Sequence, residues 1–282
     1  MLNYLLGWNS MDPFIKDEIL KRGKTVCLFP HTTSWDTITM ITQVIPNEDL
    51  HGKFWVSVRK GIPQQYIGRK IFPKYFRALE APSPEEKKMY GNTGFVDRTI
   101  ETVKNKEEFH VLMSPEGSRE RSKWKSGYYW IAKELRVPII VIGFDYGERK
   151  IKMPLIIEID WKSHKKKYCK IRLYRYYEDQ RSSIEQLRIR KSEMKNFIEE
   201  ELMDAMSNIM PLNPEDSYVI PREDLKDPCI FTSDRQIMFI LVVLFIVFVI
   251  LYIWYKLKGT YRHIYSFILI LLATYVIWCR YN

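Results

Sequence analysis

The sequence predicts an α/β domain with a mixed, largely parallel sheet flanked by helices, followed by a C-terminal helical membrane hairpin. Three observations predict this fold class. Short apolar stretches alternate with helix-like periodic stretches over the first 210 residues. After residue 236, charged residues are absent for 19 residues. Apolar residues make up 46% of the 282 residues, and Gly and Pro are few, which excludes a disordered or collagen-like chain.

The elements of the first domain, residues 1–210, are predicted from hydrophobic periodicity. Six stretches favour strands: 25–29, 54–58, 110–113, 139–144, 155–159 and 169–174. Four favour helices: 34–43, 64–75, 99–105 and 127–135. A longer amphipathic helix is expected to follow and to end at Pro211 and Pro214. Its apolar stripe consists of Ile184, Leu187, Met194, Ile198, Leu202, Ala205 and Ile209.

The C-terminal part is predicted to hold a linker and two membrane segments. Residues 211–235, with four prolines and mixed charge, are typical of a linker. Residues 237–255 carry no charge, and as a helix they would reach about 28 Å, close to the thickness of a bilayer core. Residues 264–279 form a shorter apolar run, and aromatic residues gather near the ends of both runs. A hairpin over residues 236–282 is therefore expected.

Alternatives remain for both ends of the chain. Either both apolar runs cross the bilayer, or they enter one leaflet and return, because Lys and Arg lie on the spacer and on both flanks. A buried core hairpin of a soluble domain is a third interpretation, although nothing polar interrupts the first run. Residues 1–8 lack the charged leader and cleavage site of a signal peptide and are interpreted as an interfacial or docking segment.

The first candidate for chemistry is a histidine followed five residues later by an aspartate. A predicted strand runs into His31, and a helix is expected to begin near Ser34, so Asp36 falls on its first turn. The carboxylate could then reach one imidazole nitrogen and leave the other to take a proton from a substrate hydroxyl. A loop histidine and a helix-capping aspartate explain the same residues without catalysis.

The second candidate follows the predicted strand 110–113, where Pro115 and Gly117 force a turn. Strand ends of this kind bind ligands in open α/β sheets, and exposed N–H groups beside Arg119 would suit a phosphate. An ordinary surface turn is the alternative. Farther along, four aromatic residues fit either a core or an acyl-chain channel: Trp124, Tyr128, Tyr129 and Trp130.

Two further blocks complete the pattern. Arg98 follows Gly94 in a predicted helix and could clamp a phosphate, with a surface pair between Arg98 and Asp97 as the alternative. Val137 and Pro138 lead an apolar strand that by itself indicates only core.

Taken in their order along the chain, the four blocks resemble the sequence pattern of the glycerolipid acyltransferase family. The best-known members of that family are the lysophosphatidic acid acyltransferases. That family is marked by His-x-x-x-x-Asp, a Gly-to-Arg block, Pro-Glu-Gly-(Ser/Thr)-Arg and a Val-Pro-rich apolar block. The resemblance covers about residues 5–146. Two positions depart from the pattern, because Pro30 stands where many members have Asn and Ser114 where Phe is usual.

The resemblance implies an O-acyltransferase with acyl-CoA or acyl carrier protein as co-substrate and with no other cofactor and no metal. His31 would act as general base on the acceptor hydroxyl, and Asp36 would orient it. The hydroxyl would attack the thioester carbonyl, and backbone N–H groups near the third block would stabilise the oxyanion. Five residues would position the acceptor's phosphate: Arg98, Glu116, Gly117, Ser118 and Arg119.

The expected acceptor is a lysophospholipid, with 1-acylglycerol-3-phosphate as the first choice and phosphatidic acid as the product, a step of phospholipid biosynthesis. Glycerol-3-phosphate, another lysophospholipid and acyl exchange in phospholipid remodelling are alternatives with the same chemistry. A non-catalytic basic protein that binds membrane lipid is an alternative of a different class.

The charge pattern agrees with a membrane partner. The formal charge is +10, and residues 148–195 hold 15 Lys and Arg against seven Asp and Glu. Near a bilayer, each basic residue contributes about 1 kcal/mol of attraction to anionic lipid. No nucleic-acid-binding motif accompanies these residues, so nucleic acid is not an expected partner. The expectation is an integral membrane protein with its catalytic domain on the cytosolic face and no prediction of oligomeric state.

Overall fold

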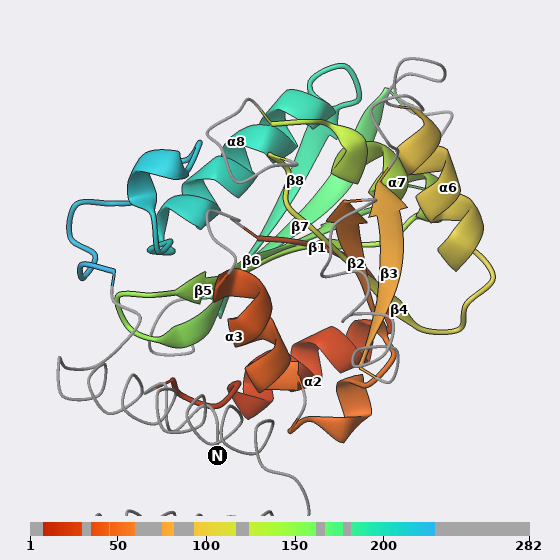
Figure 1. Ribbon diagram of the computed structural model, residues 1–282. Helices are drawn as coiled ribbons and strands as arrows, with labels where there is room; N and C mark the ends of the chain where they lie inside the picture. Colours follow the sequence, from red (N-terminus) through yellow and green to blue (C-terminus); the bar gives the residue numbers. More distant parts are fainter. Residues whose placement is uncertain are drawn as a thin grey trace, which may run out of the picture. The chain divides into compact units, whose positions relative to one another are not determined.

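The computed structural model describes residues 8–29, 35–44, 46–59, 75–81, 93–116, 124–161, 167–176 and 182–228. These residues form an α/β fold with a mixed eight-stranded sheet flanked by helices (Figure 1). They belong to the first of two compact units, Met1–Ile230. The second unit, Phe231–Asn282, contains both predicted membrane segments and lies outside the described residues. Among the described helices, none has the length and apolar character that a membrane crossing requires.

The sheet is parallel at one end and antiparallel at the other, in the order β3-β2-β4-β1-β5-β6-β7-β8. The mutually parallel strands are β1 (Lys24–Leu28), β2 (Phe54–Arg59), β3 (Phe76–Ala81), β4 (Phe109–Met113) and β5 (Ile139–Asp145). The antiparallel extension consists of β6 (Lys150–Ile159), β7 (Tyr168–Tyr176) and β8 (Ser182–Arg190). The carboxyl ends of β1, β4 and β5 therefore lie at one edge of the sheet.

Helices cover both faces of the parallel part. They are α2 (Pro13–Arg22), α3 (Trp35–Val44), α6 (Thr93–Val103), α7 (Gly127–Leu135) and α8 (Met194–Ser207), with short 3₁₀ turns at Glu48–Leu50 and Pro214–Asp216. Successive strand residues point to opposite faces. Met40 of α3 packs with Leu112 of β4, whereas Val111 belongs to the core beneath α7 and α8. Thus α3 lies on one face, with α6, α7 and α8 on the other.

All six predicted strands are confirmed, as are the helices predicted at 34–43 and 127–135. The helix predicted at 99–105 is confirmed with an earlier start, at Thr93. The helix predicted at 64–75 lies outside the described residues except for Tyr75, which is in a turn. The strand β3 and the helix α2 were not predicted. The side chain of Asp12 caps α2, accepting a 2.8 Å hydrogen bond from the N–H of Phe14.

The long amphipathic helix was predicted too early in the chain. Residues 182–190 form β8, and the helix α8 begins at Met194. Ile184 and Leu187 are three residues apart, a spacing that suits one helix face, but as strand residues they point to opposite faces. Leu187 and Ile189 accordingly pack against the core, whereas Ile184 is 59% exposed.

Residues 211–228 make up most of the segment predicted as a linker, and we call them the C-terminal strap. The strap packs against the α/β domain. The N–H of Arg222 donates to the carbonyl of Ser207 at 2.9 Å, and the N–H of Tyr218 donates to Glu116 Oε1 at 3.2 Å. A Cβ atom on Gly147 would lie 2.2 Å from the carbonyl oxygen of Lys226, so the two backbones are in close contact.

Candidate functional site

Three of the four sequence blocks lie on adjacent strands. The first block follows β1, the third follows β4, and the fourth leads into β5, while β1 pairs in parallel with both β4 and β5. Leu28 is in register with Met113 on one side and with Val141 on the other. Beyond β1, the N–H of Phe29 donates to the carbonyl of Met113 at 3.3 Å. Phe29, two residues before His31, and Met113, two residues before Pro115, therefore lie side by side at the carboxyl edge, although they are far apart in the sequence.

Asp36 lies on the first turn of α3, as predicted, and is buried. The hydroxyl of Tyr146, which directly follows β5, donates to Asp36 Oδ1 at 2.8 Å. Burial raises the pKa of Tyr146, and the negative charge of Asp36 raises it further, so the phenol stays protonated and remains a donor. Thr39, one turn farther along α3, also contacts this hydroxyl. His31 lies outside the described residues.

Tyr146 is the site residue that the sequence did not reveal. It is almost fully buried, and the Trp8 ring packs edge-on against it with ring centroids 5.1 Å apart. Nothing in the sequence around residue 146 distinguishes this tyrosine from others that follow strands. Only the parallel pairing of β1 and β5 brings it to Asp36, which lies 110 residues earlier in the chain.

Glu116 is buried and holds the backbone rather than presenting a free carboxylate. Its Oε2 atom accepts a 3.1 Å hydrogen bond from the hydroxyl of Ser114, and Oε1 accepts from the N–H of Tyr218 in the C-terminal strap. These contacts fix the turn after β4 and favour a positioning role over direct contact with a phosphate, which a carboxylate would repel. The other predicted phosphate-binding residues of this block, Gly117, Ser118 and Arg119, lie outside the described residues.

Arg98 lies on the exposed side of α6. Its Nε–H donates to the carbonyl of Gly94 at 3.0 Å, so the guanidinium is directed back toward the N-terminal turn of the helix. Arg98 is exposed and Asp36 is buried, so the structure does not bring these two predicted site residues into one buried cluster.

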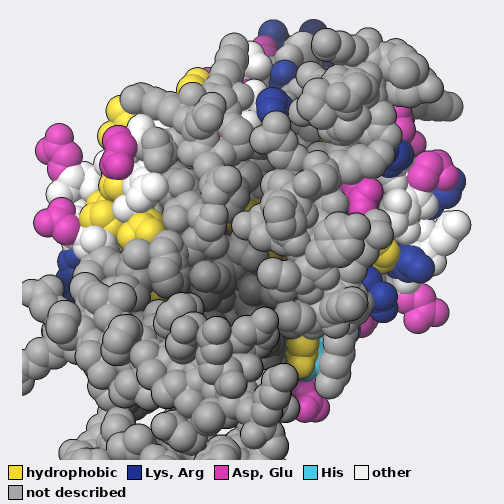
Figure 2. All heavy atoms as spheres, in the orientation of Figure 1, with side chains coloured by type: hydrophobic (Ala, Val, Ile, Leu, Met, Phe, Trp, Pro, Cys, Tyr) yellow, Lys and Arg dark blue, Asp and Glu magenta, His cyan; other side chains and the backbone are white. Residues whose placement is uncertain are grey.

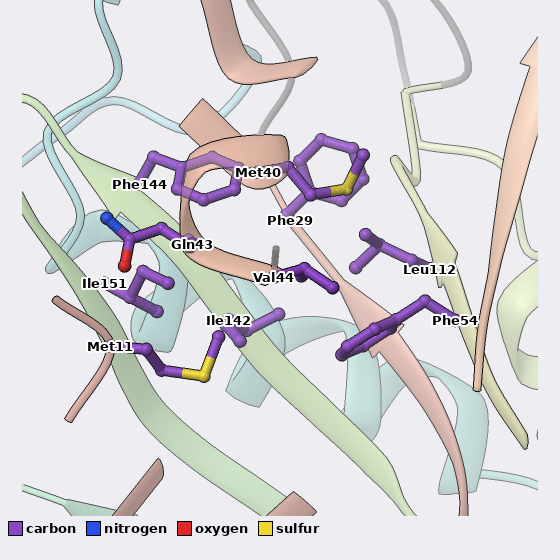
Figure 3. A pocket seen from close by; sticks show the side chains of 11 residues that line it. Met11, Phe29, Met40, Gln43, Val44, Phe54, Leu112, Ile142, Phe144 and Ile151 are labelled. Atoms are coloured by element: carbon purple, nitrogen blue, oxygen red, sulfur yellow. The ribbon is translucent and has the colours of Figure 1, made fainter. Parts of the chain in front are cut away.

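A small apolar cavity lies between α3 and the sheet (Figure 3). Its volume of about 30 Å³ is roughly two to three times the 10–15 Å³ that one water molecule needs, which is too little for an acyl chain. Among the described residues, Gln43 is the one polar side chain that lines it: Nε2 donates to the carbonyl of Asn9 at 2.9 Å, while Oε1 is buried without a described partner. The other lining residues are Met11, Phe29, Met40, Val44, Phe54, Leu112, Ile142, Gly143, Phe144 and Ile151.

The aromatic residues after the third block form core on the other face of the sheet. Trp124, Tyr128 and Tyr129 are buried in the cluster that joins α6, α7 and α8 to the strands, whereas Trp130 is 46% exposed. They do not line the cavity beside α3. Of the two interpretations of these residues, the structure favours the core.

His110, a histidine that is buried in the described part of the chain, is not a candidate for the base. His110 lies at the amino end of β4, away from the carboxyl edge, with Nδ1 2.9 Å from the hydroxyl of Thr25. Burial lowers the pKa of His110 to about 4, so the ring is neutral at pH 7. Within the described ranges, no three His, Cys, Asp or Glu side chains are placed to hold a metal ion.

No known family model matches this chain, and no curated protein matches it in sequence. The described residues define the site by a buried Asp–Tyr pair at the carboxyl ends of β1 and β5, and by a turn after β4 that a buried glutamate fixes.

Proposed function

We propose that the chain is a membrane-anchored acyltransferase. It moves a fatty acyl group from an acyl-CoA or acyl carrier protein thioester to the free hydroxyl of a lysophospholipid. The acceptor that we propose is 1-acylglycerol-3-phosphate, which makes phosphatidic acid the product. The observation that carries this proposal is the parallel pairing of β1 and β4, because the His31–Asp36 block and the Pro-Glu-Gly-Ser-Arg block continue from neighbouring strand ends.

The buried Asp36 supports the role assigned to His31. A buried carboxylate is costly unless hydrogen bonds hold it, and Tyr146 supplies one such bond. A carboxylate fixed in this way can orient an imidazole and stabilise the imidazolium that forms when the ring takes a proton. Asp36 is only five residues beyond His31 and sits at the start of α3, so the chain between them is short.

The reaction that follows from these roles is general-base acyl transfer. His31 takes the proton of the acceptor hydroxyl as its oxygen forms a bond to the thioester carbonyl carbon. Backbone N–H groups in the turn after β4 stabilise the resulting oxyanion. The carbon–sulfur bond then breaks, and the imidazolium returns its proton to the leaving thiolate. Arg98 and Arg119 bind the acceptor's phosphate, and Glu116 keeps the turn in place from behind.

The anchor in this proposal is the C-terminal segment. Residues 237–255 and 264–279 would form the membrane hairpin, and the α/β domain would face the cytosol. Both buried cysteines in the described part of the chain, Cys27 and Cys169, are free thiols, in agreement with a reducing compartment.

The test is an acyl-transfer assay with the full chain purified in detergent. Radiolabelled acyl-CoA and acyl carrier protein are each offered with 1-acylglycerol-3-phosphate, glycerol-3-phosphate and lysophosphatidylcholine. Labelled phosphatidic acid, formed fastest from 1-acylglycerol-3-phosphate, is the expected result. Preference for another acceptor would change the substrate but keep the chemistry. Binding of anionic lipid without any labelled product would show a non-catalytic protein.

A further inference from the structure

The helices α2 and α3 cover the same face of the sheet. On that face, the strands β7 and β8 extend beyond the helix α2. The antiparallel register decides which residues share a face. Cys169 pairs with Ile189, and Ile171 with Leu187, on the face packed against the core. The opposite face is formed by the alternate pairs Tyr168–Arg190, Lys170–Arg188, Arg172–Gln186 and Tyr174–Ile184.

This second face is strongly basic, and we call it the basic β7–β8 face. Its four cations, all exposed, are Lys170, Arg172, Arg188 and Arg190. Arg190 lies 3.7 Å from a carboxylate oxygen of Glu193, and Arg172 stands opposite Glu158 of β6 and hydrogen-bonds to the hydroxyl of Tyr174. Glu158 is the acidic neighbour on β6, but it pairs with Arg22 at 3.2 Å and accepts from the hydroxyl of Tyr174.

Charges of opposite sign are mixed on another part of the described surface. In Figure 2, basic and acidic side chains are interspersed along the right-hand rim. Two lysines away from the basic β7–β8 face are paired with acids, Lys104 with Glu101 and Lys53 with Glu108. At the end of the basic face nearest the carboxyl edge of β5, Ile184 adds an exposed apolar side chain.

We infer that the basic β7–β8 face docks onto the anionic surface of a phospholipid bilayer, an inference that rests on the membrane location in the proposed function. Four exposed cations on a regular sheet face complement a surface of lipid phosphates and carboxylates. The apolar side chain of Ile184 can enter the headgroup layer at the edge of the contact. Docking would hold the α/β domain against the bilayer from which its lipid acceptor comes.

The aromatic rings on the basic β7–β8 face are not exposed in the way that RNA binding requires. Single-stranded nucleic acid binding relies on exposed aromatic rings on which bases stack. The ring of Tyr168 is covered by the guanidinium of Arg188, 4.7 Å from its centroid. Tyr174 is half-buried, and its hydroxyl is bonded to Glu158. The cations are available for contact, but the stacking surface is not.

The experiment measures how fast Lys170 reacts with a water-soluble acetylating reagent in the full chain reconstituted into vesicles. Peptide mass spectrometry follows the acetylation of Lys170. Lys104, which lies just after α6 on the opposite face of the sheet, is the internal reference. The vesicles contain phosphatidylcholine alone, or phosphatidylcholine and phosphatidylserine at a ratio of about 2:1. We expect phosphatidylserine to slow acetylation of Lys170 at least about fivefold, with Lys104 unchanged and with high salt reversing the effect.

Two double variants that each remove two positive charges distinguish a contact made by the basic β7–β8 face from an effect of the net charge of the protein. Arg172→Gln/Arg188→Gln should abolish the protection of Lys170, whereas the charge-matched Arg77→Gln/Lys106→Gln, at exposed sites elsewhere, should keep it. Equal rates in both kinds of vesicle, or equal slowing of Lys104, would overturn the inference. So would protection of Lys170 by poly-uridylate RNA in neutral detergent without protection by phosphatidylserine.

Acyl transfer measured in the same vesicles distinguishes the two proposals. Transfer without protection of Lys170 would refute docking through this face and leave the acyltransferase proposal standing. Protection of Lys170 without acyl transfer would support docking through this face and refute the acyltransferase proposal.

Discussion

Asp36, five residues after the proposed base in the sequence, shows how the fold accommodates a buried charge. A carboxylate loses its hydration on burial, and hydrogen bonds must replace that hydration if the charge is to persist. The hydroxyl of Tyr146 does so across the gap between α3 and β5, and the burial of Tyr146 keeps that hydroxyl protonated. The pair therefore links the start of α3 to the end of β5 at the carboxyl edge.

Replacing Tyr146 with Phe should lower the free energy of unfolding by about 1.5–3 kcal/mol, because a hydrogen bond to a buried carboxylate is lost. Urea unfolding of the full chain in detergent, followed by tryptophan fluorescence, measures this change. Tyr128→Phe is the matched control, since the Tyr128 hydroxyl is buried and has no partner among the described residues. That variant should be neutral or slightly stabilised; an equal loss in both would show that the Tyr146–Asp36 bond is unimportant.

His110 makes the stability of the domain depend on pH. Its pKa is about 4 in the folded chain and near 6.5 in the unfolded chain, so between these values the unfolded chain binds more protons. The stabilising effect of the neutral ring is complete above pH 6.5 and is lost as the pH falls toward 4. His110→Gln should reduce the slope of unfolding free energy against pH in this window by up to about 1.4 kcal/mol per pH unit. Parallel slopes for wild type and variant would contradict this.

At the scale of elements, the C-terminal strap closes over the end of β5 and the turn after β4. Two backbone contacts define its path: Tyr218 with the carboxylate of Glu116, and Lys226 with Gly147. The strap thereby joins the third sequence block to the end of the domain, just before the segment proposed as the membrane anchor.

Gly147→Ala should detach the end of the strap, because the new Cβ would lie 2.2 Å from the carbonyl oxygen of Lys226 and neither backbone can yield easily. Limited trypsin digestion measures this as faster cleavage after Arg222 and Lys226. Gly127→Ala is the control, since its Cβ would meet the nearest side chain at an ordinary 3.5 Å. Unchanged cleavage in Gly147→Ala would mean that the strap does not depend on this contact.

The elements that could be predicted from the sequence are those in which local pattern and burial agree. The strand β5 is buried along its whole length and was predicted as a continuous apolar run. The strand β8 was misassigned because it is an edge strand whose exposed face carries charges, so its few apolar residues also fitted a helix. The helix α2 escaped prediction although Asp12, Pro13 and Gly23 mark its ends, because its apolar face contributes only two buried residues.

The candidate site was predictable only where the residues nearby in the sequence determine the structure. Asp36 could be placed on the first turn of a helix from the residues around it, whereas Tyr146 could be placed only by strand pairing over 110 residues. The burial of Glu116 likewise depends on a strap that follows it by about 100 residues in the chain. Long-range contacts of this kind leave no local pattern in one sequence.

At the scale of the whole molecule, the chain combines a basic α/β domain with a C-terminal segment of two apolar runs. The proposed function gives each part a task, because a water-soluble thioester and a lipid acceptor must meet at the bilayer surface. In that proposal, the domain would supply the proton transfer, the C-terminal segment the anchor, and the basic β7–β8 face the orientation.

The central claim is that one imidazole, that of His31, removes the proton of the acceptor hydroxyl. The most direct measurement compares acyl transfer from acyl-CoA to 1-acylglycerol-3-phosphate by wild type, His31→Ala and the control His51→Ala, all as full chains in detergent. The account predicts that His31→Ala lowers the rate by about 10²–10⁴ with unchanged unfolding, while His51→Ala keeps the wild-type rate. A folded His31→Ala variant that transfers the acyl group at the wild-type rate would contradict it.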